Sequence, residues 1–328
     1  MKTIPGRIRA CTGLLLLGIA AGAVAQDDPG AWLARMNEAL TTRNYDGVFV
    51  HVSDGRMETL RIIHRVQDGE VRERLVSLDG SGREFIRTGS ELTCYLPDQR
   101  MVLVERRTAG RTLLGSLPAF DAGVSDVYEI RGLARARLMG RMARVVAVEP
   151  KDQYRYGYRL WIDESTAMPL KTQLCDRQGR VIEQIKFASL TLATNIPDAA
   201  FQPQVAAEGF RWLRTGGDPA RTLRAVFWGA FELPPGFRLQ ARSAQLLPGS
   251  LEPVAHLVYS DGLASVSVFV ERRRSAPGDQ PLPAPARFGS SSAFSTMVDG
   301  HRVTAVGEVP PATVRFIASA VKAGEGGH

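Results

Sequence analysis

Histidine and serine side chains that could act as bases, nucleophiles or metal ligands are few in this sequence. His51 and His64 fall on neighbouring predicted strands with Ser53 nearby, an arrangement from which a hydrolase could activate a serine. No two histidines have metal-ligand spacing along a helix, and there is no Gly-x-Ser-x-Gly, phosphate-binding glycine loop or dinucleotide fingerprint. A histidine that is simply hydrogen-bonded in the core or at the surface is the commoner case, so we predict no catalytic residue, no metal site and no cofactor. The histidines are His51, His64, His256, His301 and His328.

Charged side chains offer no catalytic pair either. Asp163 and Glu164 are adjacent at the end of a predicted strand, so they face opposite ways. Five arginines that fall close together would suit phosphate groups or acidic side chains of a partner. The alternative, which we favour, is a solvated strand edge whose inner face carries Leu138, Met142 and Val146. These arginines are Arg131, Arg135, Arg137, Arg141 and Arg144.

The elements that position these residues are mostly strands. From Tyr154 to Leu192, apolar and polar residues alternate with a period of two and Gln178-Gly179 supplies a turn, which predicts three consecutive antiparallel strands. Turns at Asp54-Gly55 and Asp68-Gly69 separate earlier strands of the same kind. Such regular spacing predicts one large, strongly curved antiparallel sheet. The earlier strands cover residues 45–52, 58–65 and 73–78.

A helix is predicted just before these strands. Asp28 stands at its cap position, Pro29 in its first turn, and Trp32, Met36 and Leu40 recur at helical spacing. We expect this helix to lie against the sheet. The predicted fold class is α+β and mostly antiparallel β: a large curved half-barrel with helices on its concave side, plus a smaller C-terminal domain of β-sheet and helix.

The length of the chain and the positions of proline and glycine residues predict two folded units. A chain of 328 residues with 44% hydrophobic and 23% charged residues is long enough for two globular domains. Proline and the Gly216-Gly217 pair indicate a linker, after which further strands and a last helix beginning at Pro311 are predicted. The expected division is a signal peptide at 1–25, a half-barrel at 26–200, a linker at 201–222, a C-terminal domain at 223–323 and a tail at 324–328.

The first 25 residues have the three parts of a cleavable secretory signal. A basic start precedes an apolar core from Leu14 to Ala21, and Ala23-Val24-Ala25 forms the cleavage site. The apolar core is too short to span a bilayer well. We therefore expect a soluble, exported protein, which in a bacterium means the periplasm. Removal of three basic residues with this segment lowers the formal charge from +7 to +4, which does not suit nucleic-acid binding.

Cys94 and Cys175 are the cysteines that remain after Cys11 is removed with the signal segment. An oxidising compartment permits a disulfide between them. Two separate buried thiols are the alternative, and without geometry both readings stay open. Neither alternative is catalytic, because the sequence has no Cys-x-x-Cys and no adjacent histidine.

Several separated motifs resemble one family of proteins. Residues 45–50, 58–65 and 73–80 resemble the start of the RseB/MucB proteins, the periplasmic negative regulators of the sigma-E (AlgU-type) envelope-stress response, and residues 303–314 resemble that family's C-terminal domain. Residues 154–192 resemble the closing strands of the LolA and LolB lipoprotein carriers. The resemblance implies a LolA/LolB-like half-barrel at the N-terminus that senses lipid.

The same resemblance implies a function. The protein would bind the periplasmic domain of a membrane-spanning anti-sigma factor of the RseA/MucA type and shield it from the site-1 protease. Lipopolysaccharide or mislocalised lipoprotein would then release it. A homo-oligomer stays open, and nucleic acid is not an expected partner. A LolA-like periplasmic carrier of lipoprotein or lipid is the alternative, which the C-terminal domain disfavours; a periplasmic hydrolase is a weaker rival.

Two sets of residues are candidates for binding. Apolar residues of the curved sheet and of the irregular segment between Arg106 and Ala134 could line a lipid cavity, which that segment would cover as a lid or fill as a plug. Aromatic residues near the domain junction could anchor the partner, with burial in a core as the alternative. The cavity candidates are Val48, Val50, Leu60, Ile62, Leu92, Leu117, Phe120, Leu160 and Ile162. The partner-binding candidates are Trp212, Trp228, Phe231 and Phe237.

Overall fold

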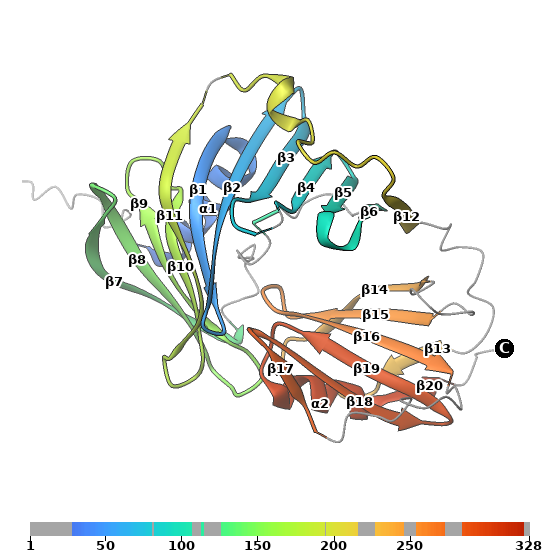
Figure 1. Ribbon diagram of the computed structural model, residues 1–328. Coiled ribbons are helices and arrows are strands. Elements are labelled where there is room, and N and C mark those ends of the chain that lie inside the picture. Colours follow the sequence, from blue (N-terminus) through green and yellow to red (C-terminus); the bar gives the residue numbers. More distant parts are fainter. Residues whose placement is uncertain are drawn as a thin grey trace, which may run out of the picture.

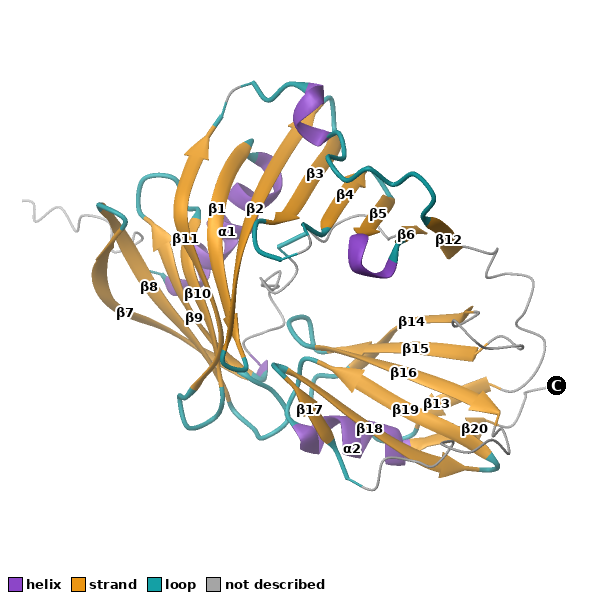
Figure 2. Ribbon diagram, in the orientation of Figure 1, coloured by secondary structure: helices purple, strands orange, loops and turns teal. Residues whose placement is uncertain are grey.

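The computed structural model places two antiparallel sheets of unequal size beside each other (Figure 1). Figure 2 shows that strands dominate both parts and that helices are few. This architecture confirms the predicted α+β, mostly antiparallel class. The residues that the structure describes are 28–80, 82–106, 113–114, 126–193, 195–215, 227–245, 254–272 and 284–324.

The large sheet contains twelve strands of the described chain, in the order β12-β6-β5-β4-β3-β2-β1-β11-β10-β9-β8-β7. Neighbouring strands are antiparallel except β12, which pairs in parallel with β6. The strands are β1 Tyr45–Ser53, β2 Arg56–Gln67, β3 Glu70–Ser77, β4 Glu84–Thr88, β5 Glu91–Leu96, β6 Met101–Arg106, β7 Tyr128–Leu138, β8 Arg141–Pro150, β9 Gly157–Asp163, β10 Pro169–Cys175, β11 Val181–Leu192 and β12 Arg211–Thr215. Short 3-10 helices lie at η2 Pro97–Gln99 and η4 Asp198–Phe201.

Two-residue turns join many of these strands. Asp54-Gly55, Asp68-Gly69 and Met139-Gly140 have positive φ at both residues, as the primed turns of antiparallel hairpins require. Glycine reaches this left-handed region without a steric penalty, and aspartate tolerates it better than most residues. The Asp-Gly pairs therefore mark hairpins in the sequence itself, whereas Met139 gives no such signal.

Helix α1 (Pro29–Thr42) lies inside the curve of the large sheet. The Asp28 carboxylate caps it by accepting hydrogen bonds from the backbone N–H groups of Gly30 and Ala31, at 3.0 and 3.3 Å. The helix contacts β2 and also β7 and β8, although five or more strand positions separate β2 from them. Since strands lie about 4.8 Å apart, one helix can touch both regions only if the sheet bends around it. The apolar side of α1 thus forms the core of the concave face, as predicted.

The opposite, convex face of the sheet is crossed by the chain that follows β11. Apolar residues of this strap, residues 193–215, bury against Ile63 and against a second cluster around Val102. Arg65 and Arg74, both buried, donate hydrogen bonds to the Ile196 and Ala200 carbonyls. The sequence predicted a linker from residue 201, but the chain stays attached to the sheet as far as Thr215 because these apolar and polar contacts hold it.

The small sheet has six strands among the described residues, in the order β14-β15-β16-β19-β18-β17, and α2 packs on it. A separate pair, β13 and β20, lies beside α2. Alternate residues of β16, such as Val266, Val268 and Val270, face the shared core. The elements are β13 Phe227–Ala230, β14 Arg238–Gln245, β15 Val254–Ser260, β16 Ser265–Arg272, β17 Ala286–Phe288, β18 Ser291–Val298, β19 His301–Gly307, α2 Pro311–Ala320 and β20 Val321–Gly324.

One alternative that the sequence left open is decided in the large sheet, and one expectation is corrected. The structure does not join Cys94 to Cys175: both thiols are buried, and β5 and β10 have five other strands between them. Met142, expected on the inner face of β8, is 45% exposed, whereas Val146 is buried as expected. The neighbouring arginines form ion pairs along this edge, for example Arg135 and Arg144 with Glu164, as a solvated strand edge would.

Candidate functional site

The large and small sheets meet through a buried ion pair. Arg155, just before β9, donates a hydrogen bond of 2.6 Å to Asp261 in the β15–β16 turn, and both side chains have 0% exposure. Asp152 accepts two further hydrogen bonds from the same guanidinium, at 3.0 and 2.9 Å. A buried charge is tolerated only when it is paired and hydrogen-bonded, and this arrangement meets both conditions.

Further hydrogen bonds and two aromatic rings hold this ion pair in place. The other oxygen of Asp261 accepts hydrogen bonds from the N–H groups of Leu263 and Ala264, and the Tyr128 hydroxyl donates to the carboxylate at 3.2 Å. The Arg155 guanidinium lies between the rings of Tyr128 and Phe237, 5.4 and 5.3 Å from their centroids. One ring comes from each sheet, so the pair fixes the position of the small sheet against the large one.

Helix α2 strengthens this first junction. The Thr313 hydroxyl donates a 2.6 Å hydrogen bond to the Tyr154 carbonyl, and the Tyr154 ring meets Phe316 edge to face. Gly236 has a positive φ, and a Cβ there would lie 2.9 Å from Val127. The loop before β14 can therefore approach the large sheet this closely only with glycine at this position.

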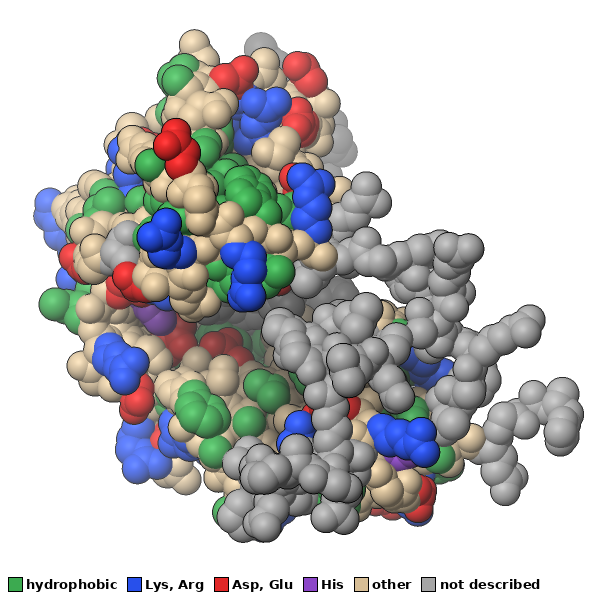
Figure 3. All heavy atoms as spheres, turned by 45° about the vertical axis from the view of Figure 1, so that its right-hand side comes forward, with side chains coloured by type: hydrophobic (Ala, Val, Ile, Leu, Met, Phe, Trp, Pro, Cys, Tyr) green, Lys and Arg blue, Asp and Glu red, His purple; other side chains and the backbone are tan. Residues whose placement is uncertain are grey.

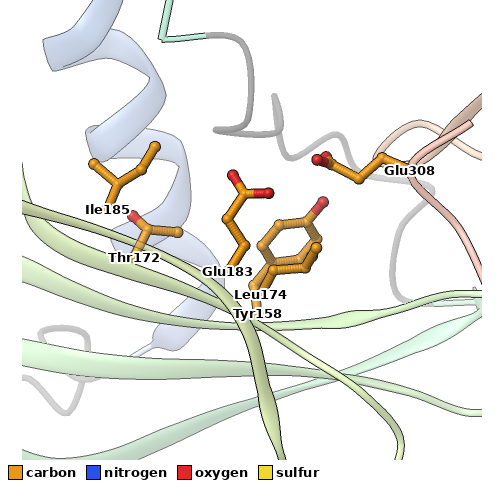
Figure 4. Close-up of a pocket in the computed structure, with 6 residues that line it drawn as sticks. All are labelled: Tyr158, Thr172, Leu174, Glu183, Ile185 and Glu308. Carbon is orange, nitrogen blue, oxygen red and sulfur yellow. The ribbon is translucent and has the colours of Figure 1, made fainter. Parts of the chain in front are cut away.

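A second, more open junction contains two carboxyl groups. Glu183 from β11 and Glu308, which follows β19, line a pocket of about 10 Å³, room for roughly one water. Figure 4 shows the Glu308 carboxyl pointing toward Glu183 with the Tyr158 hydroxyl beside them. His51 Nε2 lies 3.0 Å from Glu183, and the Ser290 hydroxyl donates a 2.7 Å hydrogen bond to Glu308.

Electrostatics at this second junction favour a charged His51–Glu183 pair. The hydrogen bond to Glu183 raises the pKa of His51 against the effect of burial. Burial opposes the ionisation of Glu183, but hydrogen bonds from His51 and other donors lower its pKa below the usual value. In Figure 3 a histidine and acidic side chains are recessed between the two parts of the molecule, and elsewhere on that face basic and acidic side chains are interspersed.

A separate buried polar cluster lies within the large sheet. The rings of Tyr45 and His64 stack with centroids 4.7 Å apart, and Glu73 accepts a 3.2 Å hydrogen bond from Arg87. The His64 Nδ1–H donates to the Arg43 carbonyl at 2.9 Å. Burial lowers the pKa of His64 to about 4 and raises the pKa of Glu73. His64 is therefore a neutral core residue at neutral pH.

The structure does not bring together the residues that suggested a hydrolase. His51 pairs across the β1–β2 ladder with Glu58, and His64 pairs with Tyr45, so the two histidines lie six residues apart in register. Ser53 instead approaches Gly289 of the small sheet. Among the described residues no group of three or more His, Cys, Asp or Glu side chains could hold a metal ion.

Four of the nine cavity candidates lie in the packed core under α1. Leu60, Ile62, Leu160 and Ile162 belong to the core cluster that includes α1, and Leu92 is also buried. Val48 and Val50 are half-buried and alternate with the core residue Phe49. Leu117 and Phe120 lie outside the described residues.

An open cavity of about 290 Å³ lies beside one of these candidates, Val50. Its other lining residues are Met139, Lys186, Phe187 and Ala188. This volume reaches the lower end of the range of small-ligand sites. The lining is largely apolar and includes one lysine, Lys186, so the cavity suits part of an acyl chain better than a polar ligand.

The four partner-binding candidates divide into two pairs. Trp228 and Phe237 are 6% and 4% exposed and belong to the core of the small sheet. Trp212 on β12 is 50% exposed and packs edge to face on Tyr95, and Phe231 is 67% exposed. Only Trp212 and Phe231 therefore present a ring that a partner could cover in this arrangement.

The residues of the first junction were not predicted from the sequence. In the sequence, Asp261 is the first residue of an Asp-Gly pair, which indicates a turn, and Arg155 is a polar residue among alternating aromatic ones. Neither residue type nor spacing says that the two side chains, 106 residues apart, share one buried site. The arginine among alternating aromatic residues is the one sequence feature that could have indicated a buried site here, and this feature is not specific.

Comparison with known proteins extends over both sheets. The family described as MucB/RseB N-terminal domain matches residues 28–205, and the family described as MucB/RseB C-terminal domain matches residues 222–322. The sigma factor AlgU regulatory protein MucB of Pseudomonas aeruginosa is 35% identical over 320 residues, covering 96% of this chain and 98% of the relative. The sigma-E factor regulatory protein RseB of Escherichia coli K12 is 29% identical, covering 99% of each chain.

Solved structures give the same result. A crystal structure of MucB in complex with MucA(peri) matches with a TM-score of 0.71 and 31% identity, over 91% of this chain and all of that chain. A further crystal structure of MucB matches with a TM-score of 0.63 and 30% identity, over 92% of this chain and 99% of that chain. Within the described residues, no helix is both long and apolar enough to cross a membrane.

Proposed function

This chain belongs to the MucB/RseB family, and from that premise we propose that it regulates a sigma factor by binding the periplasmic domain of a MucA-like anti-sigma factor. The observation that carries the proposal is the extent of the match. MucB in complex with MucA(peri) is similar to this chain over 91% of its length, so the likeness includes both sheets and the junction between them. The relatives reported above are named as regulatory proteins.

The proposed action is protective. A mature protein in the periplasm holds the anti-sigma segment in a form that the site-1 protease cannot cut, and lipopolysaccharide or a mislocalised lipoprotein releases it. Release follows from linkage: if lipid and partner favour different arrangements of the two sheets, each lowers the affinity for the other by the same factor. A tenfold effect requires about 1.4 kcal/mol of differential binding.

The large sheet offers a place for the lipid. The open cavity beside Val50 borders the core that α1 and the curved sheet share, and each methylene buried there contributes about 0.8 kcal/mol. Four to six methylenes of one acyl chain would therefore supply about 3 to 5 kcal/mol. The tenfold effect requires that about 1.4 kcal/mol of this binding energy be gained in one arrangement of the sheets and not in the other. We assign the cavity candidates and the segment that contains Leu117 and Phe120 to this lipid-binding part.

For the partner, we assign contacts to exposed aromatic residues near the chain connection between the sheets. Trp212 and Phe231 are half exposed or more, and exposed aromatic rings supply much of the binding energy where a partner covers them. Phe288 on β17 is exposed to the same 67% as Phe231 and was not predicted to bind, so it is a matched control.

The test is a binding and protection experiment. The mature chain is mixed with the periplasmic segment of a MucA-like anti-sigma factor, and affinity is measured by calorimetry alongside cleavage of that segment by the site-1 protease. We expect binding, slower cleavage, and loss of both when lipopolysaccharide or an acylated peptide is added. Phe231→Ala should weaken binding at least tenfold and Phe288→Ala should leave it unchanged. Retention of acylated peptide without any binding of the anti-sigma segment would favour the lipid-carrier alternative.

A further inference from the structure

Three basic side chains lie together on the outer face of the large sheet. On β9, β10 and β11, which are neighbours in the sheet (Figure 1), residues that alternate with core residues such as Leu160 and Ile185 point away from α1. This outward set includes Arg159 on β9, Lys171 on β10 and Lys186 on β11. The described strap packs over β2 and over β4 to β6, so it lies on another part of the outer face.

The strand register places these three cations within reach of one another. Lys171 is directly opposite Lys186 in the β10–β11 pair, and Gln173, two residues further along β10, is opposite Arg159 in the β9–β10 pair. Directly opposite side chains start about 5 Å apart, and diagonal ones about 7–8 Å apart. Lysine and arginine side chains are long enough to span such distances, so the three charged groups can converge on one small ligand.

Among the residues that the structure describes, no carboxylate pairs with these three cations. Burial lowers the pKa of Lys171, and the positive charges of Lys186 and Arg159 lower it further. The Lys171 ammonium lies over the Trp161 ring, 4.3 Å from its centroid, and this ring carries no net charge. The cations therefore repel one another, and a bound anion would relieve that repulsion.

Acidic residues that are close to this group in the sequence have other partners. Asp176, directly after β10, pairs with Arg180. Glu183 faces the other side of β11 from Lys186 and pairs with His51. Within the described chain, the positive charge of the outer group is therefore left to an external anion.

Hydrogen-bond donors accompany the charges. Gln173 donates a 2.8 Å hydrogen bond to Gln184, so the row of side chains that starts at Arg159 continues with amides rather than acids. The Nε–H group of Arg159 is buried and has no hydrogen-bond partner in the described part of the chain. A buried donor without an acceptor costs free energy, so an acceptor oxygen supplied by a ligand would be favoured there.

We propose that Arg159, Lys171 and Lys186 form a binding site for a phosphate group on the outer face of the large sheet. A phosphate ester carries about 1.5 to 2 negative charges and three strong acceptor oxygens, so one group can accept hydrogen bonds from all three side chains. A single carboxylate offers one charge and two oxygens. Lys186 also lines the open cavity beside Val50, so a phosphate ester with an apolar chain could place that chain in the cavity.

The experiment measures phosphate binding by the mature chain beginning at Gln26, in a chloride buffer of low ionic strength at pH 7. Inorganic phosphate is titrated in a calorimeter, and the titration is repeated with dihexanoyl phosphatidic acid below its micelle concentration. We expect one phosphate bound per chain, with an affinity that falls as chloride is added, because salt screens exposed charges. Equal affinities identify the phosphate group alone as the ligand, and tighter binding of the phosphatidic acid adds the cavity beside Val50 to the site.

Variants test whether these side chains hold the phosphate. Lys171→Gln removes the charge but keeps a polar side chain of similar shape, and it should weaken binding at least about tenfold, whereas Lys171→Arg should retain it. Lys322→Gln is the matched control and should leave the affinity unchanged: Lys322 also lies over an aromatic ring, 5.6 Å from the Phe231 centroid, but on β20.

Three results would overturn the proposal: no binding of either probe, binding that Lys171→Gln leaves unchanged, or an equal loss in Lys171→Gln and Lys322→Gln. The site does not depend on the proposed function. Binding of an anti-sigma segment by the same chain is measured separately, and none of these results alters it.

Discussion

Replacing Arg155 by methionine tests the claim that a buried ion pair fixes the two sheets against each other. The substitution keeps much of the apolar stem but leaves the Asp261 carboxylate at 0% exposure with no cation. Removing one member of a buried pair typically costs about 3–5 kcal/mol, because the remaining charge is not solvated. We expect a loss of that size in the free energy of unfolding, measured by urea denaturation at pH 7.

The double variant makes this prediction sharper. Asp261→Asn keeps an oxygen that can accept the N–H groups of Leu263 and Ala264 and removes the charge that Arg155→Met leaves unpaired. Adding Asp261→Asn to Arg155→Met should therefore restore about 1–3 kcal/mol rather than destabilise further. Asp152 is partly exposed, so water can solvate it once Arg155 is gone.

An exposed ion pair serves as the control. Arg180 lies 2.6 Å from Asp176, but its side chain is 77% exposed, so Arg180→Met should cost about 0–1 kcal/mol. A loss for Arg155→Met no larger than that for Arg180→Met would refute the reasoning. So would a double variant whose loss equals the sum of the two single losses, because the unpaired buried charge would then not be the cause.

Three further predictions follow from burial and close packing. His64 has a folded-state pKa of about 4 against 6.5 when unfolded, so its contribution to stability is complete above pH 6.5 and is lost as pH falls toward 4. The wild-type protein should therefore lose more free energy of unfolding between pH 7 and pH 4 than the His64→Phe variant, by on the order of 3 kcal/mol. Urea denaturation at the two pH values measures this difference. A Cβ at Gly157 would lie 2.7 Å from the Val148 carbonyl oxygen, so Gly157→Ala should lower the free energy of unfolding by about 1–3 kcal/mol in a thermal denaturation measurement. Gly132→Ala is the control: its Cβ would have its nearest contact at 3.5 Å, so the loss should be less than about 1 kcal/mol. Trp228→Ala should cost about 3–5 kcal/mol of stability, and Trp212→Ala should leave stability within about 1 kcal/mol of wild type in the same assay.

The strand pattern and the turns could be predicted because they depend on neighbouring residues. The alternation of apolar and polar side chains from Tyr154 to Leu192 corresponds to β9, β10 and β11, and Asp54-Gly55 lies at the β1–β2 turn as expected. The Asp28 cap and the apolar spacing of the following helix were likewise confirmed in α1. These features involve contacts a few residues apart, for which type and spacing are sufficient.

Contacts between distant segments could not be predicted from type and spacing. Trp228 and Trp212 are both tryptophans near the junction, yet the first is buried in the core of the small sheet and the second is exposed at the edge of the large one. The expected linker became a strap because Val205 and Phe210 bury against a cluster on β4 to β6, which is far away in the sequence. The question of the disulfide was settled by the strand order, which places β5 and β10 on different parts of the sheet.

By itself, the amino-acid sequence determined the class of fold, the succession of hairpins and the resemblance to a family, because each is recorded in local patterns of side-chain polarity and turn residues. Only the tertiary structure decided that Arg155 meets Asp261 and that Glu183 meets Glu308. Those pairs join residues more than 100 positions apart, and a charged side chain looks the same in the sequence whether water or another protein segment surrounds it. Burial and partnership are created when the sheets come together, and they decide what these charges do.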